Sequence, residues 1–378
     1  MSMKILFITI WVFCFTQFEI LSQSKIEILV YSSLPQNQKV FISGSTPELG
    51  NWNPDKIALN KINDSTWSKT FNFNAGEIIE FKFTTGSWES EALDETGKIF
   101  SNNIIKVSND TILIFNIEHW GKRQSNVYGQ ITGNVQYHRN FKGRNVLPRD
   151  IIVWLPPGYD STENKYYPVL YMNDGQNLFD PSTSTFGIDW QIDETADSLI
   201  RMKRIQEIII VGVYNTINRG NEYNNTELGR AYNQFLIEEL KPYIDATYNT
   251  LPDYKNTAIG GSSSGGLISF ILAWENSDVF SKSACLSPTF KISKIDYVAP
   301  VADYVGAKKN LKVFVYNGGI GIEERLQPGI DEMILVLKEK GFVENKDLLY
   351  IKDPEAEHGE SAWARRAGEF LEFLFPLN

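Results

Sequence analysis

The sequence is poor in two residue types that carry much of protein chemistry, with two cysteines and three histidines among 378 residues. Cys14 lies in an apolar N-terminal stretch, so a chain that loses this stretch keeps only Cys285, and an internal disulfide is excluded. The apolar neighbours of Cys285 favour a buried, inert thiol. Any chemistry that needs an imidazole must use His119, His138 or His358.

Basic clusters and long internal apolar runs are also missing. The formal net charge is -10, and no stripe of Lys and Arg offsets it locally. Such a surface repels polyphosphate chains, so nucleic acid is excluded as an expected partner. After the first two dozen residues no stretch is apolar enough to span a bilayer, which excludes a channel or transporter.

The N-terminus has the order of an export signal. Lys4 precedes an apolar run at 5–15, and a more polar stretch follows at 22–24. This order predicts a signal peptide over 1–24 and a secreted or periplasmic protein without stable membrane insertion after cleavage. The alternative is a membrane-anchored helix, because apolar residues at 18, 20 and 21 lengthen the run.

Short strand-like runs separated by Asn, Gly, Pro and Asp fill the segment 25–120. Their spacing predicts an all-β, antiparallel immunoglobulin-like sandwich of about a hundred residues. The expected strands lie at 26–30, 39–43, 67–73, 78–83 and 111–115.

From residue 146 to 378 the pattern changes to buried-type strands that alternate with amphipathic helical stretches such as 228–248. This alternation predicts an α/β unit with a mostly parallel sheet and helices on both faces. The segment 121–145 is expected to be a linker, although 129–137 could instead form a first strand of the second unit. The expected strands lie at 151–155, 169–172, 208–213, 257–260, 312–316 and 348–352.

The most specific motif is G-x-S-x-G at 261–265, which follows an expected strand and opens an expected helix that ends near Trp274. A strained strand-to-helix turn needs small residues on both sides of an exposed serine, so Ser263 is the candidate nucleophile. Ser262 and Ser264 lack the same glycine flanks. The backbone N–H of Ser264, at the start of the helix, is expected to stabilise an oxyanion. The alternative is a turn that merely reverses the chain.

A serine nucleophile requires a base to accept its proton. His119 belongs to the end of the sandwich and His138 to the expected linker. His358 follows the strand at 348–352 and precedes the last helix, where the chain order of nucleophile, acid and histidine requires the base. His358 is therefore the candidate base.

The second unit resembles the putative-esterase family of α/β-hydrolases, which includes esterase D, feruloyl esterases and mycolyl transferases. The resemblance rests on the Ser263 turn, the His358 loop, and the segments WLPPGY at 154–159, YMNDGQNLFD at 171–180, EELKPYID at 238–245 and ACLSP at 284–288. It implies an α/β-hydrolase fold and a second oxyanion donor at Gln176. It further implies that Asp174 and Asn177 of the same loop contact the substrate.

Three positions depart from that family's pattern. Asn173 stands where the family has histidine, and Ser264 stands where it has methionine. Gly321 occupies the usual position of the acid, so Glu323, or else Glu324, is the candidate acid. A Ser-His dyad without an acid is the alternative.

The first unit resembles the family 20 starch-binding carbohydrate-binding module. The similarity lies in the segments VFISGSTPELGNW at 40–52 and EFKFTTGSWE at 80–89, with Trp67 between them. It implies α-glucan binding, with Trp88 as a platform for sugar rings and Trp52, Lys82 and Glu89 beside it. Trp67 is expected in the core and Trp52 could also be there, and such sandwiches can serve only as spacers.

These features together predict an exported serine carboxyl-ester hydrolase that acts on an acylated carbohydrate or related small ester through an acyl-serine intermediate. No metal or organic cofactor is implied. Two alternatives remain at this stage. One is a carbohydrate-binding protein with weakened catalysis, and the other is an acyltransferase of the mycolyl type, which would share every catalytic residue.

Overall fold

A computed structural model describes residues 23–35, 37–93, 102–121 and 131–377. The chain divides into two compact units, the first ending at Trp120 and the second beginning at Gly121, apart from the segment 97–99. Each unit is described by itself. In the ranges covered by the structure, no helix is long and apolar enough to cross a membrane.

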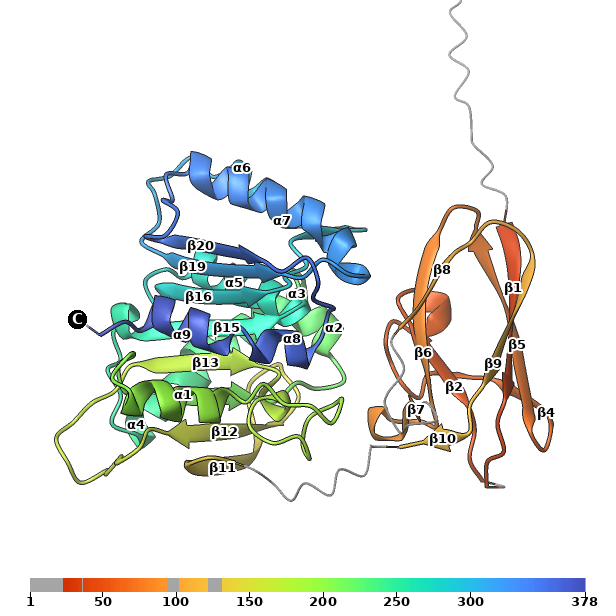
Figure 1. Cartoon of the computed structure of the whole chain (residues 1–378), viewed down its shortest axis with the longest axis horizontal. Coiled ribbons are helices and arrows are strands. Elements are labelled where there is room, and N and C mark those ends of the chain that lie inside the picture. The colour runs from red at the N-terminus through yellow and green to blue at the C-terminus, as the bar shows by residue number, and fades with distance from the viewer. Residues whose placement is uncertain (1–22, 36, 94–101, 122–130, 378) are drawn as a thin grey trace, which may run out of the picture. The chain divides into compact units, whose positions relative to one another are not determined.

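The first unit is a sandwich of two four-stranded sheets with a short ribbon (Figure 1). The pairing of β1 with β9 is parallel, which corrects the expectation of a purely antiparallel sandwich. One sheet has the order β4 (Asn60–Asn63), β5 (Thr66–Asn74), β1 (Gln23–Tyr31) and β9 (Thr111–Asn116). The other has the order β3 (Ile57–Ala58), β2 (Phe41–Gly44), β6 (Ile78–Thr84) and β8 (Asn103–Lys106), and the ribbon pairs β7 (Ala92–Leu93) with β10 (His119–Trp120).

Alternating side chains of these strands fill the space between the two sheets. Ile26, Ile28 and Val30 on β1 are buried, because every second side chain of a strand points to the same face. Trp67 is 3% exposed, and its indole N–H donates to the Ser32 carbonyl over 3.1 Å. Trp67 is therefore a core residue, as the sequence predicts.

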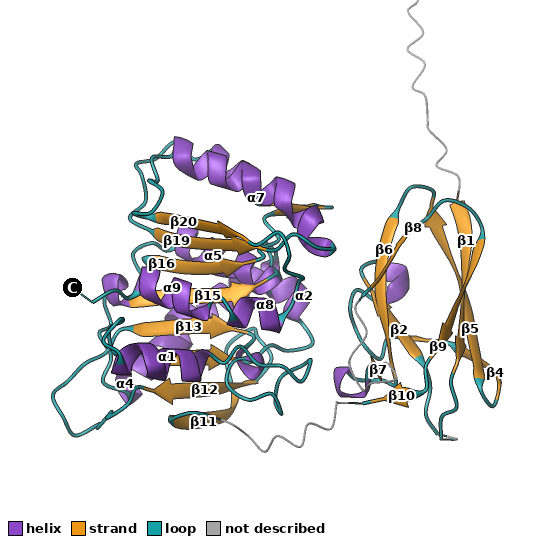
Figure 2. Ribbon diagram, viewed as in Figure 1, coloured by secondary structure: helices purple, strands orange, loops and turns teal. Residues whose placement is uncertain are grey.

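The second unit is built on one eight-stranded sheet, and Figure 2 shows its strands stacked edge to edge. The six strands from β14 onward in the sheet order are parallel, and the first two pair antiparallel. The order is β11 (Asn134–Phe141), β12 (Arg149–Leu155), β14 (Ile209–Val213), β13 (Val169–Asn173), β15 (Thr257–Ser262), β16 (Lys282–Leu286), β19 (Lys312–Asn317) and β20 (Leu348–Lys352).

Helices cover both faces of this sheet, and each face has its own apolar core. One core includes side chains of α3 (Glu227–Gln234), α4 (Lys241–Thr247), α5 (Ser264–Glu275), α6 (Val298–Ala302) and α7 (Ile322–Glu339). The other includes side chains of α1 (Ile192–Arg201), α8 (Glu360–Ala364) and α9 (Ala367–Leu374). The predicted α/β-hydrolase fold, preceded by an all-β sandwich, is confirmed.

Three boundaries differ from the expected ones. The linker expected over 121–145 is too long at its C-terminal end, because β11 pairs with β12 and belongs to the sheet. The leader expected over 1–24 overlaps β1 by two residues, since β1 begins at Gln23, and the remainder of the leader lies outside the described residues. The expected helix over 228–248 contains a π-helical segment, η4 (Phe235–Leu240), between α3 and α4. Pro242 lacks an N–H, and such a residue commonly accompanies an altered helical register.

Candidate active site

The candidate nucleophile lies at a strained turn between β15 and α5. Ser263 has φ 56° and ψ -124°, a backbone conformation that costs free energy and that clusters at functional sites. Its N–H donates to the Leu286 carbonyl over 2.8 Å, which ties the turn to β16. The Ser263 side chain is only partly buried, whereas Ser262 on β15 is 4% exposed. Of these two serines, Ser263 is the one open to a ligand.

The two glycines of the motif are required by close packing. A Cβ on Gly261 would lie 2.8 Å from the Gly265 carbonyl carbon, and a Cβ on Gly265 would lie 3.0 Å from Asp174 Oδ2. Both distances are shorter than ordinary contacts. Close packing against backbone therefore favours glycine at 261, and at 265 a side chain would require the Asp174 carboxylate to shift, in agreement with the motif.

The candidate base and acid are paired. His358 Nδ1 lies 3.0 Å from Glu323 Oε1. His358 lies in the loop between β20 and α8 and its side chain is 20% exposed, while that of Glu323 is 0% exposed. Glu323 lies in the first turn of α7, after β19, and Glu324 is exposed to solvent. The expected pairing of Glu323 with His358 is thus present.

Further hydrogen bonds hold the Glu323 carboxylate in place. The Ser287 hydroxyl donates to Glu323 Oε1 over 2.6 Å, and the Trp363 indole N–H donates to the same hydroxyl over 2.9 Å. The Trp363 ring also meets the His358 ring edge to face, with centroids 5.0 Å apart. Trp363 therefore contacts both members of the acid-base pair, one directly and one through Ser287.

The loop that precedes Glu323 and the loop that carries His358 are in close contact. Gly319 and Ile320 donate backbone N–H groups to the Ala356 carbonyl over 3.0 and 3.1 Å. A Cβ on Gly318 would lie 2.4 Å from that same carbonyl oxygen. Gly321 has φ 68°, and a Cβ there would meet nothing within 4 Å. Its role is thus to turn the chain into α7.

The expected oxyanion loop follows β13. Asp174 has φ 59°, and a single 3₁₀ turn, η3 (Gly175–Asn177), comes after it. The side-chain oxygen of Gln176 accepts from the Asn215 N–H over 3.2 Å. At the start of such a turn, and at the start of α5 where Ser264 lies, backbone N–H groups have no partner within the helix. Gln176 lies in the 3₁₀ turn after β13 and Ser264 at the start of α5, and their role as oxyanion donors stays a prediction.

Asp174 and Asn177 act as internal braces in this loop. Arg219 contacts both carboxylate oxygens of Asp174 over 2.8 Å, and Asn215 donates to Asp174 Oδ1 over 2.6 Å. The Asn177 amide donates to Glu360 Oε1 over 3.1 Å. Both residues are at least nine-tenths buried, and the expectation that they contact substrate stays a prediction. Their polar groups are used within the protein.

Sequence reasoning did not find Arg219. Burial alone would lower the pKa of Arg219, but the adjacent Asp174 carboxylate more than offsets this effect and raises it. The Arg219 side chain remains 32% exposed. Because Asp174 also lies against the Gly265 position, Arg219 is a permanent cation beside the Ser263 turn. No local motif marks this residue, since its partner is 45 positions away.

Asn173, which replaces the histidine of the family pattern, has a structural function. Its amide donates to the Ser269 hydroxyl over 2.9 Å, and its carbonyl oxygen accepts from the Tyr232 hydroxyl over 2.5 Å. These bonds connect β13 to α5 and α3. The residue therefore fixes the end of β13, from which the oxyanion loop departs.

In the sandwich, two of the four candidate sugar-binding residues lie together. The rings of Trp52 and Trp88 have centroids 6.4 Å apart and an interplanar angle of 38°, and both side chains are partly exposed. Lys82 is not exposed with them, because its ammonium forms a 2.5 Å ion pair with Glu91 and its side chain is 8% exposed. The expectation that Lys82 contacts sugar stays a prediction, although its ammonium is engaged by Glu91. The Glu89 side chain lies outside the described residues.

Comparisons with known proteins agree with these two units. Residues 147–366 match the family described as "Putative esterase", and residues 23–112 match the starch binding domain. A xylanase/feruloyl esterase of Xylanibacter ruminicola is 27% identical over 142 residues, which cover 36% of this chain and 19% of that protein. The chain spans at most 19% of the length of the curated relatives reported for it.

Two solved structures have a similar fold. A ferulic acid esterase superposes with a TM-score of 0.53 at 21% identity, covering 64% of this chain and 98% of the other. The enterobactin esterase FES of Shigella flexneri superposes with a TM-score of 0.55 at 12% identity, covering 89% of this chain and 88% of the other. Since the esterase match covers more than half of its residues, the chain belongs to the putative-esterase family, and it carries a starch binding domain in front.

Proposed function

We propose that the chain is a serine carboxyl-ester hydrolase in which Ser263 is the nucleophile, His358 the general base and Glu323 the orienting acid. The observation that carries this proposal is the 3.0 Å pairing of His358 Nδ1 with a fully buried carboxylate, on the loops that follow β19 and β20. In α/β-hydrolases these loops carry the acid and the base.

The pairing determines which nitrogen of His358 does the chemistry. Glu323 accepts a hydrogen bond from the Nδ1–H of His358, so Nε2 is left to take the proton of Ser263 as its oxygen attacks the ester carbonyl. The carboxylate then stabilises the imidazolium that forms. His358 returns the proton to the leaving alcohol, and water repeats the sequence on the acyl-serine intermediate.

Two backbone N–H groups are assigned to the oxyanion, those of Ser264 and Gln176. Both lie at the start of helical turns, where the N–H groups point outward and the helix dipole favours negative charge. Asp174 directly precedes the turn that carries Gln176, and Arg219 neutralises its carboxylate. That neutralisation matters because an unpaired anion there would repel the developing oxyanion.

We assign the substrate to the class of acylated carbohydrates and related small esters. Support comes from a relative whose name includes feruloyl esterase and from the starch binding domain in the same chain. We assign to Arg219 a contact with polar groups of the acyl or alcohol portion, because its side chain is partly exposed and its partner Asp174 lies against the Ser263 turn. The sandwich would hold an α-glucan against Trp52 and Trp88. Export to the periplasm or the medium follows from the N-terminal signal pattern.

The paired and supported Glu323 favours an active hydrolase over a carbohydrate-binding protein with weakened catalysis. A site without catalysis would not require the hydrogen bonds of Ser287 and Trp363 that hold the Glu323 carboxylate in place. A mycolyl-type acyltransferase would use the same residues. Product analysis with a sugar acceptor present and absent separates transfer from hydrolysis.

The deciding experiment is the kcat/KM of Ser263→Ala on an activated ester such as nitrophenyl acetate. We expect a loss of about 10⁴-fold or more, because the remaining site offers only oxyanion binding. Ser262→Ala and Ser264→Ala are matched controls and should keep most of the activity. Equal losses in all three variants would contradict the assignment of Ser263.

A further inference from the structure

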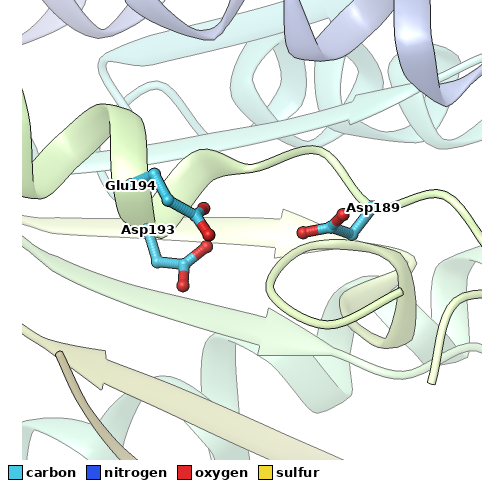
Figure 3. Close-up of side chains that lie close together, drawn as sticks. All are labelled: Asp189, Asp193 and Glu194. Atoms are coloured by element: carbon cyan, nitrogen blue, oxygen red, sulfur yellow. The ribbon is translucent and has the colours of Figure 1, made fainter. Parts of the chain in front are cut away.

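Three carboxylates that the proposed hydrolysis does not use lie together where the loop after η3 enters α1. They belong to Asp189, Asp193 and Glu194, and one oxygen of each lies within 4.8 Å of the others. Figure 3 shows the carboxylates of Asp193 and Glu194 turned toward one another, with that of Asp189 directed toward them from the loop.

Asp189 and Asp193 are buried and Glu194 is partly buried, and two oxygens of the cluster have no partner. Asp193 is 0% exposed, and its Oδ1 has no hydrogen-bond partner, nor has Glu194 Oε2. Asp193 Oδ2 accepts from the Thr132 N–H over 2.7 Å, and Asp189 Oδ2 accepts from the Gln191 N–H over 3.3 Å. Among the described residues, no Lys or Arg forms an ion pair with any of the three. A buried ionised carboxylate without a positive partner is costly, so such a group either takes up a proton or binds a cation.

We propose that Asp189, Asp193 and Glu194 bind a divalent cation of the calcium class. Two oxygens bound to one Ca²⁺ at about 2.4 Å can be no more than about 4.8 Å apart, and the three atoms lie within that limit of one another. Carboxylate oxygens are the ligands that such hard cations prefer. Water and backbone carbonyls complete the usual six to eight ligands of Ca²⁺.

A divalent ion bound by these three carboxylates would depart from the expectation from sequence, in which no metal is implied.

The cation would stabilise a loop that braces the active site. Trp190, next to Asp189, donates its backbone N–H to the Asn177 carbonyl over 2.9 Å. Its ring lies against that of Trp363, with centroids 5.8 Å apart. The loop is thereby connected to the oxyanion turn on one side and to the support of Glu323 on the other. Cation binding is thus expected to raise stability and also to influence turnover.

The test uses the full chain, dialysed against EGTA and titrated with CaCl₂ by calorimetry. We expect one bound Ca²⁺ per chain, and a rise in the melting temperature of roughly 5–10 °C when free Ca²⁺ exceeds its dissociation constant about a hundredfold. Asp193→Asn should abolish both responses. Asp197→Asn removes an acid on the same helix that pairs with Arg201 on the surface, and it should leave both responses intact.

Binding and melting do not depend on catalysis, so these readouts also stand if the proposed esterase activity fails. If Asp193→Asn does not fold, Asp189→Asn and Glu194→Gln replace it, with the same expectation. An unchanged Ca²⁺ response in the variants would place the ion elsewhere and overturn the proposal. So would an absent response in the wild type at about 5 mM CaCl₂, above the range of known Ca²⁺ sites, and a shared proton would then explain the cluster.

Discussion

Both units of the molecule contain a buried carboxylate paired with a basic side chain, and the two pairs differ in the solvent exposure of the base. In the hydrolase unit Glu323 is fully buried and His358 is 20% exposed. In the sandwich Glu91 and Lys82 are 1% and 8% exposed. A pair whose base reaches solvent can exchange a proton with a ligand, while a pair buried at both ends can only contribute to folding. Loss of one partner should therefore lower activity in the hydrolase unit and stability in the sandwich.

The largest effect is expected for Glu323→Gln. A neutral amide cannot stabilise the imidazolium of His358, so kcat on an activated ester should fall by about 10³ to 10⁴-fold while the fold persists. Glu324→Gln is the matched control, since that side chain is exposed, and it should be nearly silent. Circular dichroism checks the fold of both variants. Mild losses in both would favour a Ser-His dyad.

Lys82→Met tests the other pair. Methionine keeps the apolar stem of lysine but removes the cation, so the sandwich should lose about 3 kcal/mol of unfolding free energy near pH 8 with esterase activity unchanged.

The loss of unfolding free energy in Lys82→Met should be larger at high pH than at low pH. Burial already raises the pKa of Glu91 above its ordinary value, against the lowering effect of Lys82, and removal of Lys82 raises it further. An acid with a raised pKa in the folded state favours folding at low pH and loses that contribution as the pH rises. The destabilisation should therefore be smaller near pH 5. Chemical denaturation at both pH values measures it, and an equal loss at both would contradict this account.

Arg219→Lys compares a buried ion pair with an exposed one. Lysine cannot hold both oxygens of Asp174, so we expect a loss of about 1–2 kcal/mol in stability and a lower kcat/KM. Arg201→Lys changes a similar bidentate pair with Asp197 on the surface and should cost less than about 0.5 kcal/mol. Activity that survives Arg219→Lys unchanged would remove Arg219 from the substrate site.

The smallest effect concerns the exposed surface of the sandwich. Trp88→Ala should lower the affinity for soluble starch or a cyclodextrin by about tenfold, near 1.4 kcal/mol, and leave esterase activity unchanged. Tyr31→Ala removes another exposed aromatic side chain of the same unit and serves as the control. Isothermal titration with cyclodextrin measures both, and equal affinities would place the sugar surface elsewhere.

Local patterns predict the fold well here, because each strand and the Ser263 turn depend on neighbouring residues. The strands over 151–155 and 257–260 follow from their apolar runs, and they form with small shifts at their ends. The pairing of Glu323 with His358 could also be predicted, since chain order restricts the acid to the loop after β19. The roles of these residues remain predictions until the variants are measured.

Residues whose function depends on distant partners could not be predicted. Asp174 and Lys82 are polar residues in motifs that resemble binding sites, yet Arg219 and Glu91 pair with them inside the protein. Nothing within a short window of sequence indicates such partners. The carboxylates of Asp189, Asp193 and Glu194 lie close together in the sequence, but their burial is set by the fold and could not be predicted from that window.

The turn at Gly321 has a consequence for how related enzymes are recognised. The helix that starts at Ile322 presents Glu323 to His358, two residues beyond the glycine at the position that the family resemblance gives to the acid. A search that scores one alignment column would find glycine there and discard this chain as inactive, whereas the pairing with His358 predicts an active enzyme. Inventories of inactive homologues should therefore be checked against geometry.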